Sequence, residues 1–287
     1  MKIDDNLPKS KDKTKKCLDM TEKFKKFKQI CQGEKLAKQK RKKDWWHAGP
    51  RLISIYITWI LVKTPVTANF VSIFGILIGL AGLYLIFLGT NFTIFLGFIL
   101  LYLHHISDEI DGEVARYKRQ TSVRGIYYDE ISHLLIHGML FLTFGFSVYK
   151  RTDDILYVIL GFLGSFFLLG IRIIRKIPII ATSKSAVYNI VNFKDNSSQK
   201  TEIKKGGLKI IKAIIMNLVN AFSHTMLIIT MFFIGYILYI NFNVLWILEL
   251  LIKLYVVFIL IVFIFYMITK FKSLETDVVK VYNKIVQ

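Results

Sequence analysis

The chain has 287 residues, of which 54% are hydrophobic and 14% aromatic, and its formal net charge is +19. A soluble domain of this length would not need so much apolar sequence, and the length leaves little room for a second soluble domain beside a membrane domain. The positive charge also suits nucleic acid, but the sequence has no recognisable nucleic-acid-binding motif, so we expect no nucleic-acid partner. Both cysteines, Cys17 and Cys31, lie in the basic N-terminal region and predict no disulfide framework.

The N-terminal region, residues 1–46, is predicted to be a basic cytosolic tail, and its first residues lack the apolar core of a cleaved signal peptide. Apolar side chains recur at helical spacing between its lysines: Met20, Phe24, Phe27 and Cys31. Residues 18–42 therefore form either a helix on the membrane surface or a solvated or disordered segment. Residues 47–63 are apolar but too short to cross about 30 Å of hydrocarbon, so they predict an interfacial amphipathic helix.

Six longer apolar segments follow, and they predict an all-α polytopic membrane protein built on a six-transmembrane-helix bundle. They cover residues 67–89, 92–117, 125–148, 154–174, 208–240 and 244–270. The predicted bundle domain comprises residues 64–275, and residues 276–287 are expected to form a cytosolic C-terminal tail.

The charges of the connections predict the topology. The connections after the second and fourth spans are rich in Lys and Arg, whereas those after the first and fifth spans are uncharged. Because basic loops stay on the cytoplasmic side, both termini are expected to be cytoplasmic. Lys150 and Arg151, after the third span, oppose this rule.

Two further patterns predict how helices pack. Gly75 and Gly79, with Ala81 and Gly82 following, form a small-residue face on the first span, which favours a close approach of another helix. Glu249 and Lys253 are four residues apart in the last span, which predicts an ion pair within that helix.

The stretch that joins the second and third spans points to chemistry. Asp108 and Asp111 are three residues apart and share one helical face, and Asp129 follows on the next span after a basic turn. Each unpaired acid would cost roughly 2.5–3.5 kcal/mol at a helix centre in hydrocarbon. Three converging carboxylates would instead form an oxygen-rich site suited to Mg²⁺ or Mn²⁺. Small or basic residues stand nearby, where a nucleotide phosphate could approach the backbone: Gly112, Ala115, Arg116 and Gly125.

This pattern resembles the signature of the CDP-alcohol phosphotransferase family, D-x2-D-G-x2-A-R-x8-G-x3-D-x3-D. Seven positions match at the right spacing: Asp108, Asp111, Gly112, Ala115, Arg116, Gly125 and Asp129. Residues 64–69 also resemble the Thr-Pro-x-Thr-x-Asn segment that opens the first span in this family, and they include Thr67 and Asn69.

The resemblance implies a membrane-embedded transferase of phospholipid biosynthesis with a cytoplasmic active site. A CDP-linked donor, which we interpret as a CDP-lipid, would transfer a substituted phosphate to an acceptor alcohol and release CMP. Two Mg²⁺ or Mn²⁺ ions are implied as cofactors, held by Asp108, Asp111 and Asp129. The implied nucleotide-binding residues come from both matching segments: Thr67, Asn69, Asp108, Gly112, Ala115, Arg116 and Gly125.

His133 departs from the family pattern, because the fourth aspartate of the signature falls on it. In the family that aspartate is taken as the base that deprotonates the acceptor hydroxyl. A histidine, with an ordinary pKa of about 6.5, suits this task, and neutral imidazole also binds metals. Our hypothesis is that His133 is the catalytic base, a metal ligand, or both. The alternative is an inactive family member that acts as a membrane scaffold.

Three cations end the fourth span at the predicted cytoplasmic face: Arg172, Arg175 and Lys176. They predict either a site for the phosphate of a phosphorylated polyol acceptor or ordinary positive-inside anchoring. A small polar alcohol is the other acceptor hypothesis, and membrane lipids and a second copy in a homodimer are further expected partners. The rival function is a metal or proton transporter, but no acidic residue lies between Val66 and Leu88 of the first span or between Ile155 and Arg172 of the fourth, which argues against it.

Other polar residues near the signature have structural interpretations. We expect His104 and His137, each one turn from a signature position, to satisfy hydrogen bonds in the bundle core. Glu109, Glu113 and Glu130 each lie about 100° round their helix from a neighbouring signature residue, so we expect them to face basic loops.

Overall fold

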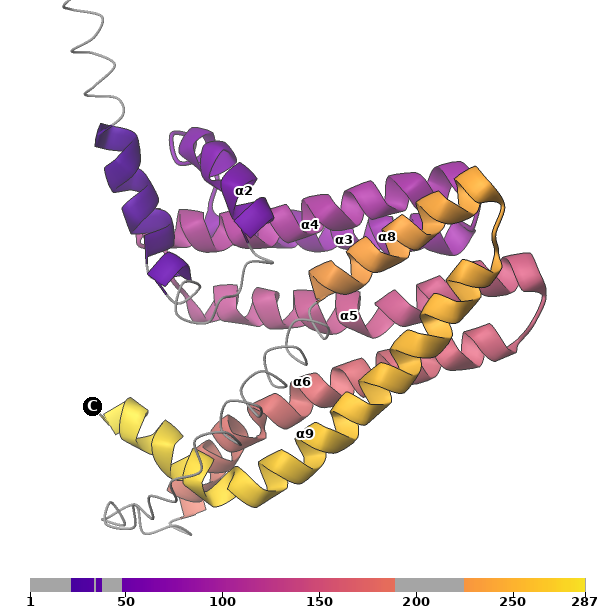
Figure 1. Ribbon diagram of the computed structural model, residues 1–287. Coiled ribbons are helices and arrows are strands. Elements are labelled where there is room, and N and C mark those ends of the chain that lie inside the picture. Colours follow the sequence, from indigo (N-terminus) through magenta and orange to yellow (C-terminus); the bar gives the residue numbers. More distant parts are fainter. Residues whose placement is uncertain (1–21, 34, 38–47, 189–224, 287) are drawn as a thin grey trace, which may run out of the picture. The chain divides into compact units, whose positions relative to one another are not determined.

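A computed structural model describes residues 22–33, 35–37, 48–188 and 225–286 of the chain. These residues form α-helices and short connections, with no β-strand among them, which confirms the predicted all-α fold (Figure 1). Much of the predicted N-terminal tail and the first half of the fifth predicted span lie outside the described residues.

Six of the described helices are long and apolar enough to cross a membrane, and each overlaps one predicted span. They are α3 (Ala68–Leu88), α4 (Asn91–Lys118), α5 (Val123–Thr152), α6 (Leu156–Tyr188), α8 (Thr225–Phe242) and α9 (Trp246–Val286). Two of them extend more than ten residues beyond the predicted end, since α6 continues past residue 174 to Tyr188 and α9 past residue 270 to Val286. A shorter helix, α2 (Ala48–Leu61), precedes the six.

Each of four tight connections between helices contains one residue in the left-handed backbone region. The angle φ is 83° at Gly89, 53° at Arg119, 56° at Asp153 and 52° at Asn243. Glycine adopts this conformation freely, and Asp and Asn tolerate it, so these residues end their helices at little cost. Arg119, in the turn between the two signature helices, has neither advantage and is strained by roughly 1 kcal/mol.

The described residues divide into two compact units. The first unit contains the chain up to Leu77 together with Leu103–Ser132, and the second contains Ile78–Tyr102 and the chain from His133 onward. Helices α3, α4 and α5 each begin in one unit and end in the other. All three signature aspartates belong to the first unit.

Within the first unit, α2 is amphipathic, and its polar face rather than its apolar face is turned toward the protein interior. Its polar side chains are buried, since Arg51 is 8% exposed and Ser54 and Thr58 are fully buried. Five of its large apolar side chains are exposed instead: Leu52, Ile53, Tyr56, Ile57 and Ile60. An exposed apolar stripe on a short helix is what an interfacial helix presents to lipid, so this pattern is consistent with the interfacial helix predicted at 47–63.

The helix at residues 22–33 packs against α2. Phe27 and Cys31 are buried and form a core cluster with Ile55 of α2. The rings of Phe27 and Trp59 meet edge to face, with 4.7 Å between their centroids. The apolar stripe of this helix therefore lies in a protein core, and the alternative of a purely solvated or disordered segment is wrong for residues 22–33. The reason is that α2 offers an apolar partner that local sequence patterns do not reveal.

In the second unit, α9 packs along α6 and also contacts α8 (Figure 1). The predicted close approach at Gly82 is confirmed, because a Cβ there would lie 2.9 Å from the carbonyl oxygen of Gly97 on α4. The predicted pair of Glu249 and Lys253 is also present, with 3.8 Å between Oε2 and Nζ. Tyr157 of α6 donates a further hydrogen bond to Glu249 at 2.6 Å.

Candidate functional site

The start of α3 is held beside the end of α4, and this contact brings the two matching sequence segments together. Lys118, in the last turn of α4, donates from Nζ to the carbonyl oxygens of Thr64 and Val66, at 2.7 Å each. One ring nitrogen of the buried His104 lies 2.9 Å from the carbonyl oxygen of Gly75 on α3. The interpretation of His104 as a hydrogen-bonded core residue is therefore confirmed.

The three signature aspartates converge in the first unit. Asp108 and Asp111 lie one turn apart on α4, and Asp129 lies in the second turn of α5. One carboxylate oxygen of Asp108 lies within 4.8 Å of one from Asp129. Asp111 accepts a hydrogen bond of 2.6 Å from the hydroxyl of Ser72 on α3. Acids that are 18 or more residues apart in the sequence thus meet, as the spacing predicts.

A pocket of about 260 Å³ adjoins these acids. Its volume is close to the lower end of the roughly 300–1,000 Å³ typical of ligand sites, so it has room for part of a ligand and not only for an ion. The residues lining it include all three signature aspartates and, besides Asp108, four more of the predicted nucleotide residues: Asn69, Gly112, Ala115 and Gly125. A second hollow of about 10 Å³, the size of one water molecule or ion, is also lined by Asp108, Asp111 and Asp129.

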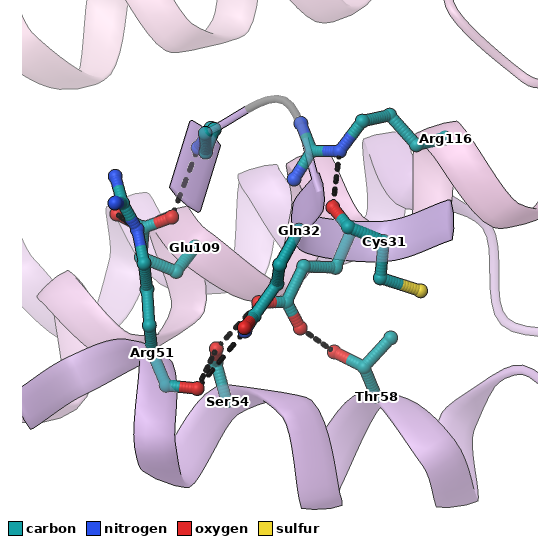
Figure 2. Close-up of polar contacts among 9 residues, drawn as sticks. Cys31, Gln32, Arg51, Ser54, Thr58, Glu109 and Arg116 are labelled. Atoms are coloured by element: carbon teal, nitrogen blue, oxygen red, sulfur yellow. Dashed lines mark hydrogen bonds and ion pairs between the residues drawn. The ribbon is translucent and has the colours of Figure 1, made fainter. Parts of the chain in front are cut away.

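Two predicted nucleotide residues stand outside this lining. Thr67 caps α3, because its Oγ1 accepts a hydrogen bond from the backbone nitrogen of Phe70 at 3.3 Å, and it lines a neighbouring hollow with Asn69. Arg116 turns toward the helix at 22–33, where its Nε donates to the carbonyl oxygen of Cys31 at 2.5 Å (Figure 2). A Cβ at Gly112 would lie 3.1 Å from Nη1 of Arg116, so glycine at 112 leaves room for the guanidinium.

His133 follows Asp129 by one turn of the uninterrupted helix α5, and it is the first residue of α5 that belongs to the second unit. Its ring centroid lies 5.0 Å from that of His137. Nε2 of His137 is 2.6 Å from the hydroxyl of Thr225 on α8, which confirms that His137 satisfies a hydrogen bond inside the bundle.

The cations Arg172, Arg175 and Lys176 lie on α6 and also belong to the second unit. Nη2 of Arg175 donates to the hydroxyl of Tyr266 on α9 at 2.9 Å. The guanidinium carbon of Arg175 lies 4.6 Å from the centre of the same ring. One hydrogen-bond donor of the Arg175 guanidinium is therefore already bonded to Tyr266.

Two acids outside the signature, Glu109 and Glu113, have partners that differ from the basic loops expected. Glu109 pairs with two cations, Lys35 at 2.9 Å and Arg51 at 3.2 Å, and both come from helical segments rather than loops. Glu113 is fully buried, and its hydrogen bonds come from an amide and two hydroxyls: Gln32, Ser54 and Thr58 (Figure 2). The expectation of a basic loop is wrong for Glu113, because α2 and the helix at 22–33 cover this side of α4.

The pocket also contains residues that the sequence analysis missed, among them Lys35, Ser72 and Gln120–Ser122. Ser72 lies about one turn after Asn69 on α3, so helical spacing from the matched segment could have identified it. Lys35 carries no comparable signal, because it is one of many lysines in a basic stretch.

A sequence model of the CDP-alcohol phosphatidyltransferase family matches residues 65–281 of the chain. The match begins just before α3 and ends within α9, so it includes every signature position and excludes α2 and the helix at 22–33. A search of curated proteins found no match to the chain.

Proposed function

Because the chain belongs to the CDP-alcohol phosphatidyltransferase family, and is thereby a membrane transferase of phospholipid synthesis, we propose that its donor is a CDP-linked lipid and its acceptor a polar alcohol. The acceptor oxygen attacks the β-phosphorus of the donor, the bond from that phosphorus to the bridging oxygen breaks, and CMP leaves with that oxygen. The observation that carries this proposal is the convergence of Asp108, Asp111 and Asp129 on one pocket beside Gly112 and Gly125.

The chemistry of the pocket fits divalent cations. Carboxylate oxygens are the ligands that Mg²⁺ and Mn²⁺ prefer, and all three aspartates also line the hollow of about 10 Å³. We therefore assign Asp108, Asp111 and Asp129 as ligands of two such ions. When bound, the ions supply neutralisation of the phosphate charge.

Residues of the chain position the nucleotide. Gly112 and Gly125 carry no side chain, so a nucleotide can approach the backbone of α4 and of α5. Asn69 and Thr67 offer hydrogen-bonding groups at the start of α3, next to Gly125. Arg116 reaches the nucleotide only if its guanidinium exchanges the Cys31 carbonyl for a phosphate oxygen.

His133 is our candidate for the base, which accepts the proton of the acceptor hydroxyl at a ring nitrogen. This proposal depends on the place of His133, one turn after Asp129 on α5. Arg172, Arg175 and Lys176 are the candidate site for the phosphate of a phosphorylated acceptor, because they are three cations in one stretch of α6. We assign the site to the cytoplasmic side, which the basic connection after α4 supports.

The test is CMP release by the purified chain in lipid, with a panel of CDP-lipids and Mg²⁺ or Mn²⁺. Asp108→Asn, Asp111→Asn and Asp129→Asn should each abolish turnover without unfolding, since each removes a charged ligand with little change in volume. Chelation of the metal should also stop the wild type, and added Mg²⁺ or Mn²⁺ should restore it. Near-normal release by two of the three variants would refute the metal assignment. Metal or proton uptake into vesicles without CMP release would favour a transporter.

A further inference from the structure

The helix at 22–33, which lies outside the family match, is anchored to the signature helix α4 by aromatic contacts. The ring of Phe27, which is 2% exposed, lies 4.9 Å from that of Tyr117 on α4 and 4.7 Å from that of Trp59 on α2. Cys31, one turn later, is fully buried, and its carbonyl oxygen accepts the hydrogen bond from Arg116. These contacts hold the C-terminal end of the helix next to the signature.

A buried polar network fixes the same helix (Figure 2). Nε2 of Gln32 donates to the carboxylate of Glu113 at 2.5 Å and to the carbonyl oxygen of Arg51 at 2.9 Å. Ser54 and Thr58 also donate to Glu113, at 2.7 and 2.6 Å. A fully buried carboxylate needs such partners, because unpaired burial of a charge is very unfavourable. The network therefore determines which described residue of the N-terminal segment reaches the pocket of the signature aspartates.

That residue is Lys35. Its Nζ lies 2.9 Å from Oε2 of Glu109, and its side chain remains 36% exposed. Lys35 also lines the pocket of the signature aspartates, and among the described residues in that lining it is the only one with a positive charge. An ammonium group has three donors, and Glu109 accepts one of them. Glu109 stays paired when Lys35 turns to a ligand, because Nε of Arg51 also contacts it, at 3.2 Å.

We propose that Lys35 binds the diphosphate of the nucleotide-linked donor, and that Glu109 is a positioning residue that holds Lys35 at the pocket. Phosphate oxygens are the ligands that a lysine at the edge of an acidic pocket is suited to bind, through charge-assisted hydrogen bonds. Lys35 lines the same pocket as Asp108, Asp111 and Gly112, so the substrate that it contacts is the nucleotide-linked donor rather than the acceptor. The inference rests on the function proposed above and adds to it a contact from outside the family-matched region.

The test compares Lys35→Ala and Lys35→Arg with Lys26→Ala, a matched control on the exposed face of the same helical segment. Initial rates of CMP release are measured while donor and acceptor are varied separately. We expect Lys35→Ala to raise the KM for the CDP-lipid about tenfold and to leave the KM for the acceptor unchanged. Tenfold is the lower end of the loss of affinity expected when a hydrogen bond to a charged group is removed. Lys35→Arg should recover part of the loss, and Lys26→Ala should match the wild type. A donor KM within twofold of the wild-type value in Lys35→Ala would overturn the proposal.

Calorimetry of CDP binding in the presence of Mg²⁺ tests the role of Lys35 separately from the proposed transfer reaction. If the wild type binds CDP but releases no CMP from any donor, the transfer reaction is refuted, and the Kd of Lys35→Ala for CDP still decides the role of Lys35. A weaker Kd supports the contact and an unchanged Kd overturns it. Glu109→Gln should weaken CDP binding in the same direction, and its effect should not add to that of Lys35→Ala, because both act through one ammonium group. If the wild type binds no CDP, both proposals are wrong.

Discussion

Gln32→Ala tests whether the buried network holds the helix at 22–33 on the signature helix. Gln32 is 2% exposed and supplies the hydrogen bond from this helix to Glu113. The substitution removes that charge-assisted bond and a neutral one to the carbonyl oxygen of Arg51. Glu113 keeps its bonds from Ser54 and Thr58, so its charge stays paired. Hydrogen bonds to charged groups contribute about 1.5–3 kcal/mol, so undocking should become easier by about 2 kcal/mol, which corresponds to roughly 30-fold.

The thiol of Cys31 reports undocking directly. It is fully buried, and burial raises the pKa of this thiol to about 12, with the charge of Glu113 adding to the rise and that of Arg116 opposing it. At pH 8 only about one docked thiol in ten thousand is therefore ionised, and none is accessible to an alkylating reagent. After undocking, the pKa returns toward the usual value of about 8.5 and the thiolate forms. Alkylation should therefore follow the undocked population when redocking is faster than the reaction.

The assay measures alkylation of Cys31 by N-ethylmaleimide in a Cys17→Ser background. Gln29→Ala, an exposed glutamine on the same helix, is the matched control and should label at the wild-type rate. Gln32→Ala should label about 30-fold faster, within a range of roughly 10- to 150-fold. Equal rates for Gln32→Ala and Gln29→Ala would show that the network does not hold the helix.

Three further predictions concern the base, the acceptor and the topology. His133→Ala should lower turnover by about 10²–10⁴-fold, the usual range for loss of a general base, whereas His133→Asp, which restores the family residue, should keep substantial activity at pH 7. An active Ala variant with an unchanged pH profile would show that His133 is not the base. Arg175→Ala should raise the KM for a phosphorylated acceptor and leave that for the donor unchanged; equal effects on both would indicate a structural role, such as its contact with Tyr266. A cysteine in place of Phe92, which is 74% exposed, should react with an impermeant reagent from outside the cell, and one in place of Val123, 84% exposed, only after permeabilisation. The reverse result would refute the cytoplasmic placement of the site.

The sequence predicted those features that depend on short-range periodicity. Six apolar segments of sufficient length predicted six helices that could cross a membrane, and the spacing of Asp108 and Asp111 predicted a shared helical face. The convergence with Asp129 also followed, because only a short basic turn separates the two helices. Each of these inferences uses residues within one helix or across one turn, where geometry is nearly independent of the rest of the fold.

The partners of Glu109 and Glu113 could not be predicted in this way. Their hydrogen bonds join residues between 55 and 81 positions apart, and no local pattern pairs such distant positions. The apolar stripe of α2 was recognisable, but the burial of its polar face depends on the acids of α4. Tertiary contacts between polar groups are specific to the assembled structure, whereas hydrophobic periodicity is visible in each segment alone.

Lys150 and Arg151 oppose the charge rule for a similar reason. Nζ of Lys150 lies 3.0 Å from the carbonyl oxygen of Phe87 and 3.1 Å from that of Leu88, at the end of α3. Nη2 of Arg151 donates to the carbonyl oxygen of Gly89 at 3.0 Å. The last carbonyls of a helix lack partners within the helix and carry partial negative charge, so two cations here cap α3. Because Lys150 and Arg151 have this structural role, the positive charge of their connection is not evidence that the connection is cytoplasmic.

The signature helix α4 carries two pairs of carboxylates with different requirements. Asp108 and Asp111 line the pocket, where their charge is useful only if a cation binds. Glu109 and Glu113, about 100° round the helix from signature residues, are buried and need permanent partners. The partners described above come from residues 32–58, before the family match begins at residue 65. A chain shortened to the matched region would lack these groups, and the buried carboxylate of Glu113 would lose its hydrogen bonds from Gln32, Ser54 and Thr58. The helix at 22–33 and α2 therefore stabilise the part of α4 that carries the site. Lys35, which pairs with Glu109, also lines the pocket.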